Sequence, residues 1–106
     1  MLDSIKKLLG ITPKADFAEL VKAGAIIIDV RTKGEYAGGH IRGSVNIPLD
    51  KLVSNLNKLK KNKDIITCCA SGSRSASAKG ILTSHGYNNV HNGGSWMSLR
   101  RKIDIF

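Results

Sequence analysis

The hydrophobic positions of the chain fall into short continuous runs. Residues 25–30 read Ala-Ile-Ile-Ile-Asp-Val and residues 64–68 read Asp-Ile-Ile-Thr-Cys. Continuous runs rich in β-branched residues are typical of parallel strands that are buried on both faces. Shorter runs at 45–48 and 89–91 predict two further strands. Because helical patterns lie between these runs, the sequence indicates an α/β domain with a parallel sheet.

A helix is predicted ahead of the first strand. Phe17, Leu20 and Val21 recur at a spacing that places three apolar side chains on one helix face. We expect this helix to begin at Pro13, with Thr12 as its N-cap.

Three further helical segments are predicted between the strands. Residues 32–35 read Thr-Lys-Gly-Glu, a capping-box pattern that opens a short helical turn. Asp50 is expected to cap a helix that carries an apolar stripe. The stripe comprises Leu52, Val53, Leu56 and Leu59. Small residues from about 75 to 85 predict a helix after the second buried strand, with Gly86 as its stop.

A loop of small residues directly follows that strand. It reads Cys69-Ala70-Ser71-Gly72-Ser73-Arg74-Ser75. Ligands of parallel α/β sheets bind at the carboxyl ends of the strands. Loop N–H groups and a helix N-terminus together favour a bound anion. We therefore expect residues 70–75 to bind an anionic substrate.

The same surroundings predict an activated nucleophile at Cys69. Positive potential from backbone N–H groups and a helix N-terminus favours the thiolate and lowers a cysteine pKa. Arg74 adds a fixed charge suited to an oxyanion, and the hydroxyls of Ser71, Ser73 and Ser75 are potential donors. Cys69 is thus a candidate nucleophile that needs no histidine base.

The adjacent cysteines allow two frames for this loop. Counted from Cys69 the spacing to Arg74 is Cys-x4-Arg, whereas from Cys68 it is Cys-x5-Arg. The longer frame is that of cysteine-dependent phosphatases and arsenate reductases. Because side chains alternate along a strand, we expect Cys68 to be a small buried residue and Cys69 to open the loop.

Ordered motifs along the chain resemble the rhodanese-homology domains. The resemblance rests on four segments. They are 29–31 (Asp-Val-Arg), 35–36 (Glu-Tyr), 39–48 (Gly-His-Ile-Arg-Gly-Ser-Val-Asn-Ile-Pro) and the loop 69–75. Gly86-Tyr87, Gly93-Gly94 and Trp96 resemble the closing segment of the family. The resemblance implies one rhodanese-like domain over 1–106, with a core of about 11–97, and a five-stranded parallel sheet in a three-layer α/β/α arrangement.

The resemblance also implies a function. Cys69 would take a sulfane sulfur from a donor such as thiosulfate and pass it to cyanide, a thiol or a protein acceptor. N–H groups from Ala70 to Arg74 would stabilise the terminal sulfur of the persulfide. The alternatives are phosphatase or arsenate reductase chemistry in the Cys68 frame and a non-catalytic binding module.

The composition predicts a basic surface but does not indicate a nucleic-acid partner. The chain has 106 residues and a formal net charge of +9. Its densest basic runs are 58–63 and 100–102, and neither has an aromatic stacking partner in the sequence. A short turn that carries Trp96 is expected before the second run. We expect solvated basic faces and no nucleic-acid binding. No metal-ligand spacing and no cofactor motif occur. Lacking a signal-like or membrane-spanning stretch, the chain is expected in the cytoplasm.

Overall fold

The computed structural model describes residues 16–103 and shows an α/β domain. Its four strands are β1 (Ile26–Asp29), β2 (Val45–Asn46), β3 (Ile65–Cys69) and β4 (Val90–Ser95). They form one sheet in the order β2-β1-β3-β4, and every neighbouring pair is parallel. All four predicted strands are confirmed.

The sheet therefore has four strands in the described residues, not the five that the resemblance implied. The hydrophobic pattern of the sequence contains only four strand-like runs, and no further apolar run predicts a fifth strand. The domain has one strand fewer than expected, and its parallel α/β class is as predicted.

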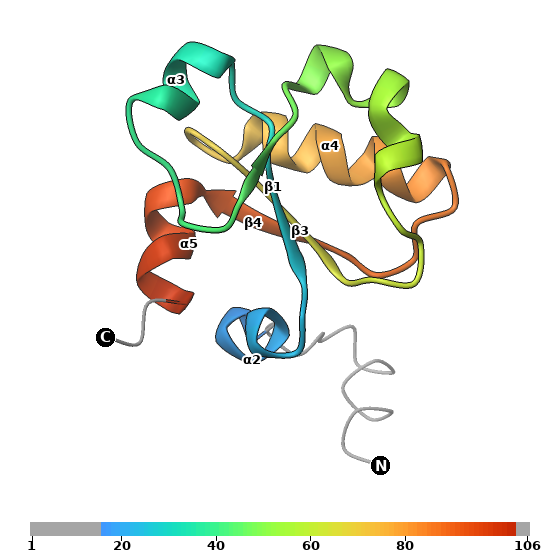
Figure 1. Ribbon diagram of the computed structural model, residues 1–106, viewed down its shortest axis with the longest axis horizontal. Helices are drawn as coiled ribbons and strands as arrows, with labels where there is room; N and C mark the ends of the chain where they lie inside the picture. The colour runs from blue at the N-terminus through green and yellow to red at the C-terminus, as the bar shows by residue number, and fades with distance from the viewer. Residues whose placement is uncertain (1–15, 104–106) are drawn as a thin grey trace, which may run out of the picture.

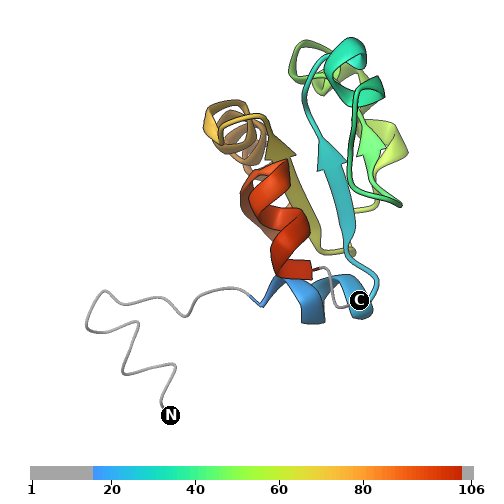
Figure 2. The same ribbon diagram turned by 90° about the vertical axis from the view of Figure 1, so that its left-hand side faces the viewer.

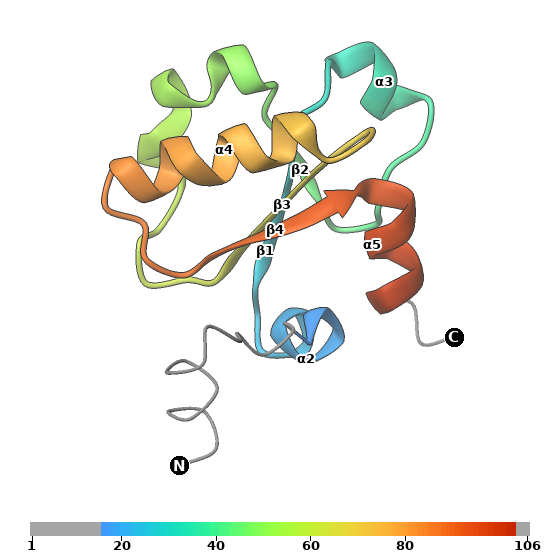
Figure 3. The ribbon, with the colours of Figure 1, turned by 180° about the vertical axis from the view of Figure 1, so that it is seen from behind.

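Helices lie on both faces of the sheet. They are α2 (Phe17–Lys22), α3 (Lys33–Ala37), α4 (Ser73–Ser84) and α5 (Trp96–Ile103), with the 3₁₀ helices η1 (Leu49–Lys51) and η2 (Val53–Lys58). In Figures 1 and 3, α4 and the 3₁₀ helices lie on one side of the strands, whereas α2 and α5 lie on the other. This arrangement produces two separate apolar clusters, one on each face.

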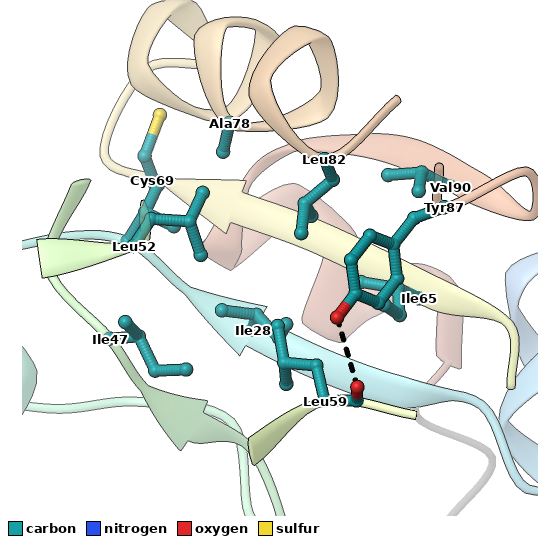
Figure 4. Close-up of a cluster of buried hydrophobic side chains, with 11 residues drawn as sticks. Ile28, Ile47, Leu52, Leu59, Ile65, Cys69, Ala78, Leu82, Tyr87 and Val90 are labelled. Atoms are coloured by element: carbon teal, nitrogen blue, oxygen red, sulfur yellow. Dashed lines mark hydrogen bonds between the residues drawn. The ribbon is translucent and has the colours of Figure 1, made fainter. Parts of the chain in front are cut away.

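The first cluster contains the buried side chains between the sheet and α4 (Figure 4). They include Ile28, Ile65, Leu52, Leu82 and Tyr87. The second cluster joins Phe17 of α2 and Leu99 of α5 to Ile27, Ile66 and Cys68. Because neighbouring residues of β1 and β3 belong to opposite clusters, the alternation of side chains assigns each strand residue to one face.

Two predicted helices differ from the structure. Thr12 and Pro13 lie outside the described residues, but the helix that carries Phe17 begins at Phe17 itself. Asp16 is its N-cap, with an extended backbone and a carboxylate that accepts the Glu19 N–H at 3.1 Å. An aspartate side chain satisfies this unpaired donor directly, so the helix starts there.

The predicted helix after Asp50 was also wrong. The segment forms η1 and η2, and Asp50 lies within η1 without capping it. Side chains of Ser54 and Asn55 both donate to the Lys51 carbonyl, at 3.0 and 2.7 Å. Such bonds compete with the backbone pattern of an α-helix. Leu52 and Leu59 are buried as predicted, whereas Val53 is 55% exposed.

The closing segment is longer and more ordered than the predicted turn. Gly93 and Gly94 lie within β4, and Trp96 begins α5. The prediction that the basic runs 58–63 and 100–102 lack aromatic partners was wrong for both. In the first run, the Lys61 ammonium lies 5.6 Å from the centre of the Tyr87 ring. Arg100 lies 5.1 Å from the centre of the Trp96 ring, and the Lys102 ammonium lies 5.6 Å from that of Phe17. No helix within residues 16–103 is long and apolar enough to cross a membrane.

Candidate active site

The carboxyl ends of the parallel strands β1 and β3 lie at the same end of the sheet. In Figure 2, β1 and β3 run in the same direction, with α3 and the start of α4 at their carboxyl ends and α2 at the opposite end. Residues 70–72 connect β3 to α4 at this end. The predicted loop therefore lies where parallel sheets bind their ligands.

Two backbone N–H groups point at the Cys69 sulfur. The Gly72 N–H donates to Sγ at 2.9 Å and the Ser75 N–H donates at 3.3 Å. Cys69 is the last residue of β3, and its side chain lies on the face of the sheet that carries Ala78 and Leu82 of α4 (Figure 4). Such donors stabilise negative charge on a sulfur atom.

Gly72 shapes this turn because its backbone is left-handed. Gly72 has a φ of 109°, a backbone conformation that residues other than glycine rarely adopt. It is the residue immediately before α4. A Cβ at this position would lie 3.7 Å from the Gly94 Cα. The turn thus brings the first N–H groups of α4 towards Cys69.

A buried polar network fixes the start of α4. The Thr67 hydroxyl donates to the Ser75 carbonyl at 3.0 Å and lies 2.8 Å from the Ser75 hydroxyl. The Ser75 hydroxyl donates to the Asn92 side-chain oxygen, which also accepts the Gly94 N–H at 2.9 Å. Because Thr67 and Ser75 are fully buried, these bonds tie α4 firmly to β3 and β4.

This network changes the expected role of Ser75. Its hydroxyl was expected to be available to a ligand, but it is buried and bonded to Thr67 and Asn92. Its backbone N–H is the group that contacts Cys69. Ala70, Ser71 and Ser73 are exposed around the turn, and Gly72 is half-buried.

Arg74 forms a bidentate ion pair with Glu35. Its Nη1 lies 2.7 Å from Oε1, and its Nη2 donates to Oε2 at 3.0 Å. Both side chains are about one-third exposed, at 34% and 36%. Arg74 was predicted to hold a bound oxyanion, and in this structure it holds a carboxylate of the protein.

Glu35 is positioned by the capping box of α3. It accepts from the Thr32 N–H at 3.0 Å, and the Thr32 hydroxyl accepts the Glu35 N–H at 3.2 Å. The Arg74 guanidinium and the Thr32 donors lower the pKa of Glu35 to about 2. Glu35 therefore remains a carboxylate at neutral pH and keeps Arg74 near the loop.

Asp29 and Arg31 form a buried ion pair behind the site. Arg31 Nε donates to Oδ1 at 2.9 Å, and Nη2 lies 2.7 Å from Oδ2. Arg31 Nη2 also donates to the Gly39 carbonyl at 2.7 Å, and its guanidinium lies 4.7 Å from the Trp96 ring centre. Asp29 is therefore linked to the neighbouring loop through Arg31, whose guanidinium bonds both the Asp29 carboxylate and the Gly39 carbonyl.

Cys68 occupies the opposite face of the sheet. It is fully buried with Phe17, Ile27, Ile66 and Leu99. Burial, reinforced by the nearby Asp29 carboxylate, raises the pKa of Cys68 to about 12. The Cys68 thiol is therefore uncharged at neutral pH, as expected of a buried structural residue.

Three residues of the site were not assigned these roles from the sequence. Thr67 and Asn92 support the loop, and Glu35 is the partner of Arg74. The sequence marks Glu35 only as part of a capping box, and its pairing with Arg74 depends on β1 and β3 being neighbours in the folded sheet. Within residues 16–103 no group of three or more His, Cys, Asp and Glu side chains is placed to hold a metal ion.

Comparison with known proteins assigns the family. The family described as "Rhodanese-like domain" matches residues 13–98. The chain belongs to this family. Among curated relatives, thiosulfate sulfurtransferase PspE of Escherichia coli is 36% identical over 69 residues, covering 63% of this chain and 66% of the relative.

Other similar proteins extend this likeness. The uncharacterized protein YqhL of Bacillus subtilis is 37% identical over 68 residues, covering 64% of this chain and 54% of its own length. The structure titled "rhodanese with anions from E. coli" has a TM-score of 0.67 and 32% identity, covering 71% of this chain and 91% of that one. A human single-domain sulfurtransferase has a TM-score of 0.71 and 29% identity, and the match covers 79% of this chain and 88% of that one.

Proposed function

We propose that this rhodanese-like domain is a sulfurtransferase that uses Cys69 as its nucleophile. The observation that carries the proposal is the pair of N–H donors, from Gly72 and Ser75, directed at the Cys69 sulfur. Relatives named as thiosulfate sulfurtransferases support the reaction class. The donor is a small sulfur-containing anion such as thiosulfate, and the acceptor is cyanide or a thiol.

The proposed reaction has two balanced steps. The Cys69 thiolate attacks the outer sulfur of thiosulfate, a new S–S bond forms, and the bond to the sulfonate sulfur breaks. Sulfite leaves with the electron pair, and the cysteine persulfide anion remains. In the second step cyanide attacks the outer sulfur of the persulfide, which releases thiocyanate and restores the thiolate.

The loop residues are assigned roles in both steps. Backbone N–H groups around Gly72 stabilise the negative sulfur of the persulfide, as an oxyanion hole stabilises oxygen. Ala70, Ser71 and Ser73 border the space that the donor enters. Arg74 supplies positive charge that attracts the sulfonate of the donor. It binds the sulfonate either while still paired with Glu35 or after releasing Glu35. Because Cys69 is fully buried, the donor reaches Sγ only when the covering residues move locally.

Phosphatase or arsenate reductase chemistry in the Cys68 frame has less support. Cys68 points to the opposite face of the sheet from the loop N–H groups, and its raised pKa keeps it protonated. A non-catalytic binding module would need neither Cys69 nor its two donors.

Steady-state kinetics separate these three functions. Thiocyanate formation should follow a double-displacement pattern, with parallel double-reciprocal lines when thiosulfate is varied at several cyanide concentrations. The same preparation should release no phosphate from p-nitrophenyl phosphate and should not reduce arsenate. Turnover of a phosphate ester without thiocyanate formation would replace the proposal, and inactivity in all assays would favour the binding module.

A further inference from the structure

The edge of the sheet next to β2 carries a basic groove of about 320 Å³. Three lysines line it, namely Lys33 of α3, Lys51 of η1 and Lys58 of η2. No aspartate or glutamate is among the lining residues. Among residues 16–103, none of these three ammonium groups forms an ion pair. The groove therefore concentrates positive charge that the described protein does not neutralise.

The carboxylates that could have balanced this charge have other partners. Asp29 pairs with Arg31, Glu35 with Arg74 and Asp64 with His91. Asp50 is adjacent to Lys51 in sequence but does not line the groove. An anionic occupant would thus meet three cations without displacing a carboxylate of the groove.

Apolar side chains also line the groove. They include Val45, Ile47 and Leu59. Val45 is 45% exposed, so a ligand can contact it, whereas Ile47 and Leu59 are buried. A ligand that fits this groove combines negative charge with apolar side chains, which a simple inorganic anion does not.

The groove also lies along an open strand edge and leads towards the catalytic loop. β2 is the edge strand, and no described strand pairs with its outer side. Lys33, which lines the groove, is two residues before Glu35, the partner of Arg74. An extended segment lying on β2 would therefore approach the Cys69 end of the sheet.

We infer that this groove docks an extended acidic segment, with interspersed apolar residues, of a protein that accepts sulfur from Cys69. Charge complementarity with the three lysines selects the segment, and Val45 contacts an apolar side chain. The acceptor role rests on the proposed function, whereas the docking itself does not.

A binding assay isolates the docking step. The probe is a short fluorescein-labelled peptide in which glutamate alternates with valine, and its control has glutamine in place of glutamate. Fluorescence anisotropy with the full Cys69→Ser chain measures affinity without sulfur transfer. The groove variant is Lys33→Gln/Lys51→Gln/Lys58→Gln. Its matched control is Lys63→Gln/Lys79→Gln/Arg101→Gln, which removes the same charge from exposed positions outside the groove.

The groove variant should bind the acidic peptide about tenfold more weakly, because three modest charge contacts are lost together. The control variant should bind within about twofold of the parent, and NMR shift changes should gather on β2, η1 and η2. The inference would be overturned if both variants bound the acidic peptide equally weakly or if the NMR shift changes lay on another face. It would also be overturned if the glutamine peptide bound equally well, or if a single-stranded oligonucleotide bound the groove more tightly than the acidic peptide.

Thiosulfate–cyanide turnover, measured with Cys69 present, distinguishes the two proposals. It should be equal in the parent, groove and control chains, since cyanide needs no docking. Turnover without peptide binding would refute the groove alone. Peptide binding without turnover would refute the sulfurtransferase function and the acceptor role while leaving the docking surface. Peptide-specific binding together with faster sulfur delivery to a cysteine-tailed acidic peptide than to its glutamine control supports both.

Discussion

Cys68 and Cys69 are neighbours with the same side chain and the same full burial, yet they lie in different surroundings. Cys68 faces the cluster of Phe17 and Leu99, where burial raises its pKa to about 12. Cys69 faces the start of α4, where the N–H groups of Gly72 and Ser75 reach its sulfur. Despite equal burial, the two sulfurs therefore lie in different surroundings, and the proposed function assigns the nucleophile to the one that has two N–H donors.

The difference arises from strand alternation and from the end of the strand. Successive residues of β3 point to opposite faces, so only one of the two cysteines can face α4. Because β3 ends at Cys69, the chain turns at once and brings helix N–H groups to that sulfur.

Replacement of the two cysteines should give the largest difference. Cys69→Ser should lower the rate of thiocyanate formation at least about 10³-fold, because the nucleophile is lost. Cys68→Ser, the matched change one residue earlier, should retain activity within about threefold and mainly reduce stability, because it buries a hydroxyl among apolar groups. Similar losses in both variants would remove the distinction between the two faces.

Gly93 closes the Cys68 side and should tolerate no side chain. A Cβ there would lie 2.7 Å from the Thr67 carbonyl oxygen and 2.9 Å from side-chain atoms of both Ile66 and Leu99. Gly93→Ala should therefore destabilise the domain by about 1–3 kcal/mol in denaturant unfolding. Gly80→Ala is the control, since Gly80 lies in α4 with no atom within 4 Å of its Cβ position. It should stabilise by about 0.5–1 kcal/mol, and an equal loss in both variants would contradict the packing described.

Alkaline unfolding should report the closed environment of Cys68. Its pKa rises from an ordinary 9.0 to about 12 on folding, so its contribution to stability is complete below pH 9 and is lost as the pH rises to about 12. Cys68→Ala should therefore lose stability less steeply than the parent over this range. Parallel curves from pH 9 to 12 would show that Cys68 ionises as readily in the folded chain as in the unfolded one.

The Glu35–Arg74 pair on the Cys69 side should contribute least to the stability of the fold, and its contribution should change at acidic rather than alkaline pH. The pKa of Glu35 falls from 4.5 to about 2 on folding, so its contribution is present above pH 4.5 and is lost as the pH falls to about 2. The difference in thermal stability between the parent and Glu35→Gln should thus shrink from pH 5 to pH 2. Glu19→Gln, which removes an exposed pair with Lys22 at 3.6 Å, should cause a smaller change. A gap for Glu35→Gln that stays constant with pH would exclude this pairing in solution.

The sequence predicted those parts of the fold that follow from local patterns. Strands such as β1 and β3 are continuous apolar runs, and the capping box of α3 is a local motif, so both could be recognised. The segment after Asp50 could not, because side chains of Ser54 and Asn55 redirect its backbone into 3₁₀ turns. The fifth strand came from resemblance alone, with no apolar run to support it.

The candidate site was predictable where it is contiguous in sequence. Cys69, Arg74 and the small residues between them form one loop, and strand alternation separated Cys69 from Cys68. The supporting contacts were not predictable in the same way. Asn92 reaches Ser75 and Glu35 reaches Arg74 only after the parallel sheet has brought β4 and α3 beside the loop.

The most direct test is mass spectrometry of the intact, reduced protein before and after thiosulfate, with the modified residue localised by fragmentation. We expect a gain of one sulfur atom on Cys69, reversed by cyanide, and none on Cys68. A sulfur on Cys68, or no adduct on either cysteine, would contradict this expectation.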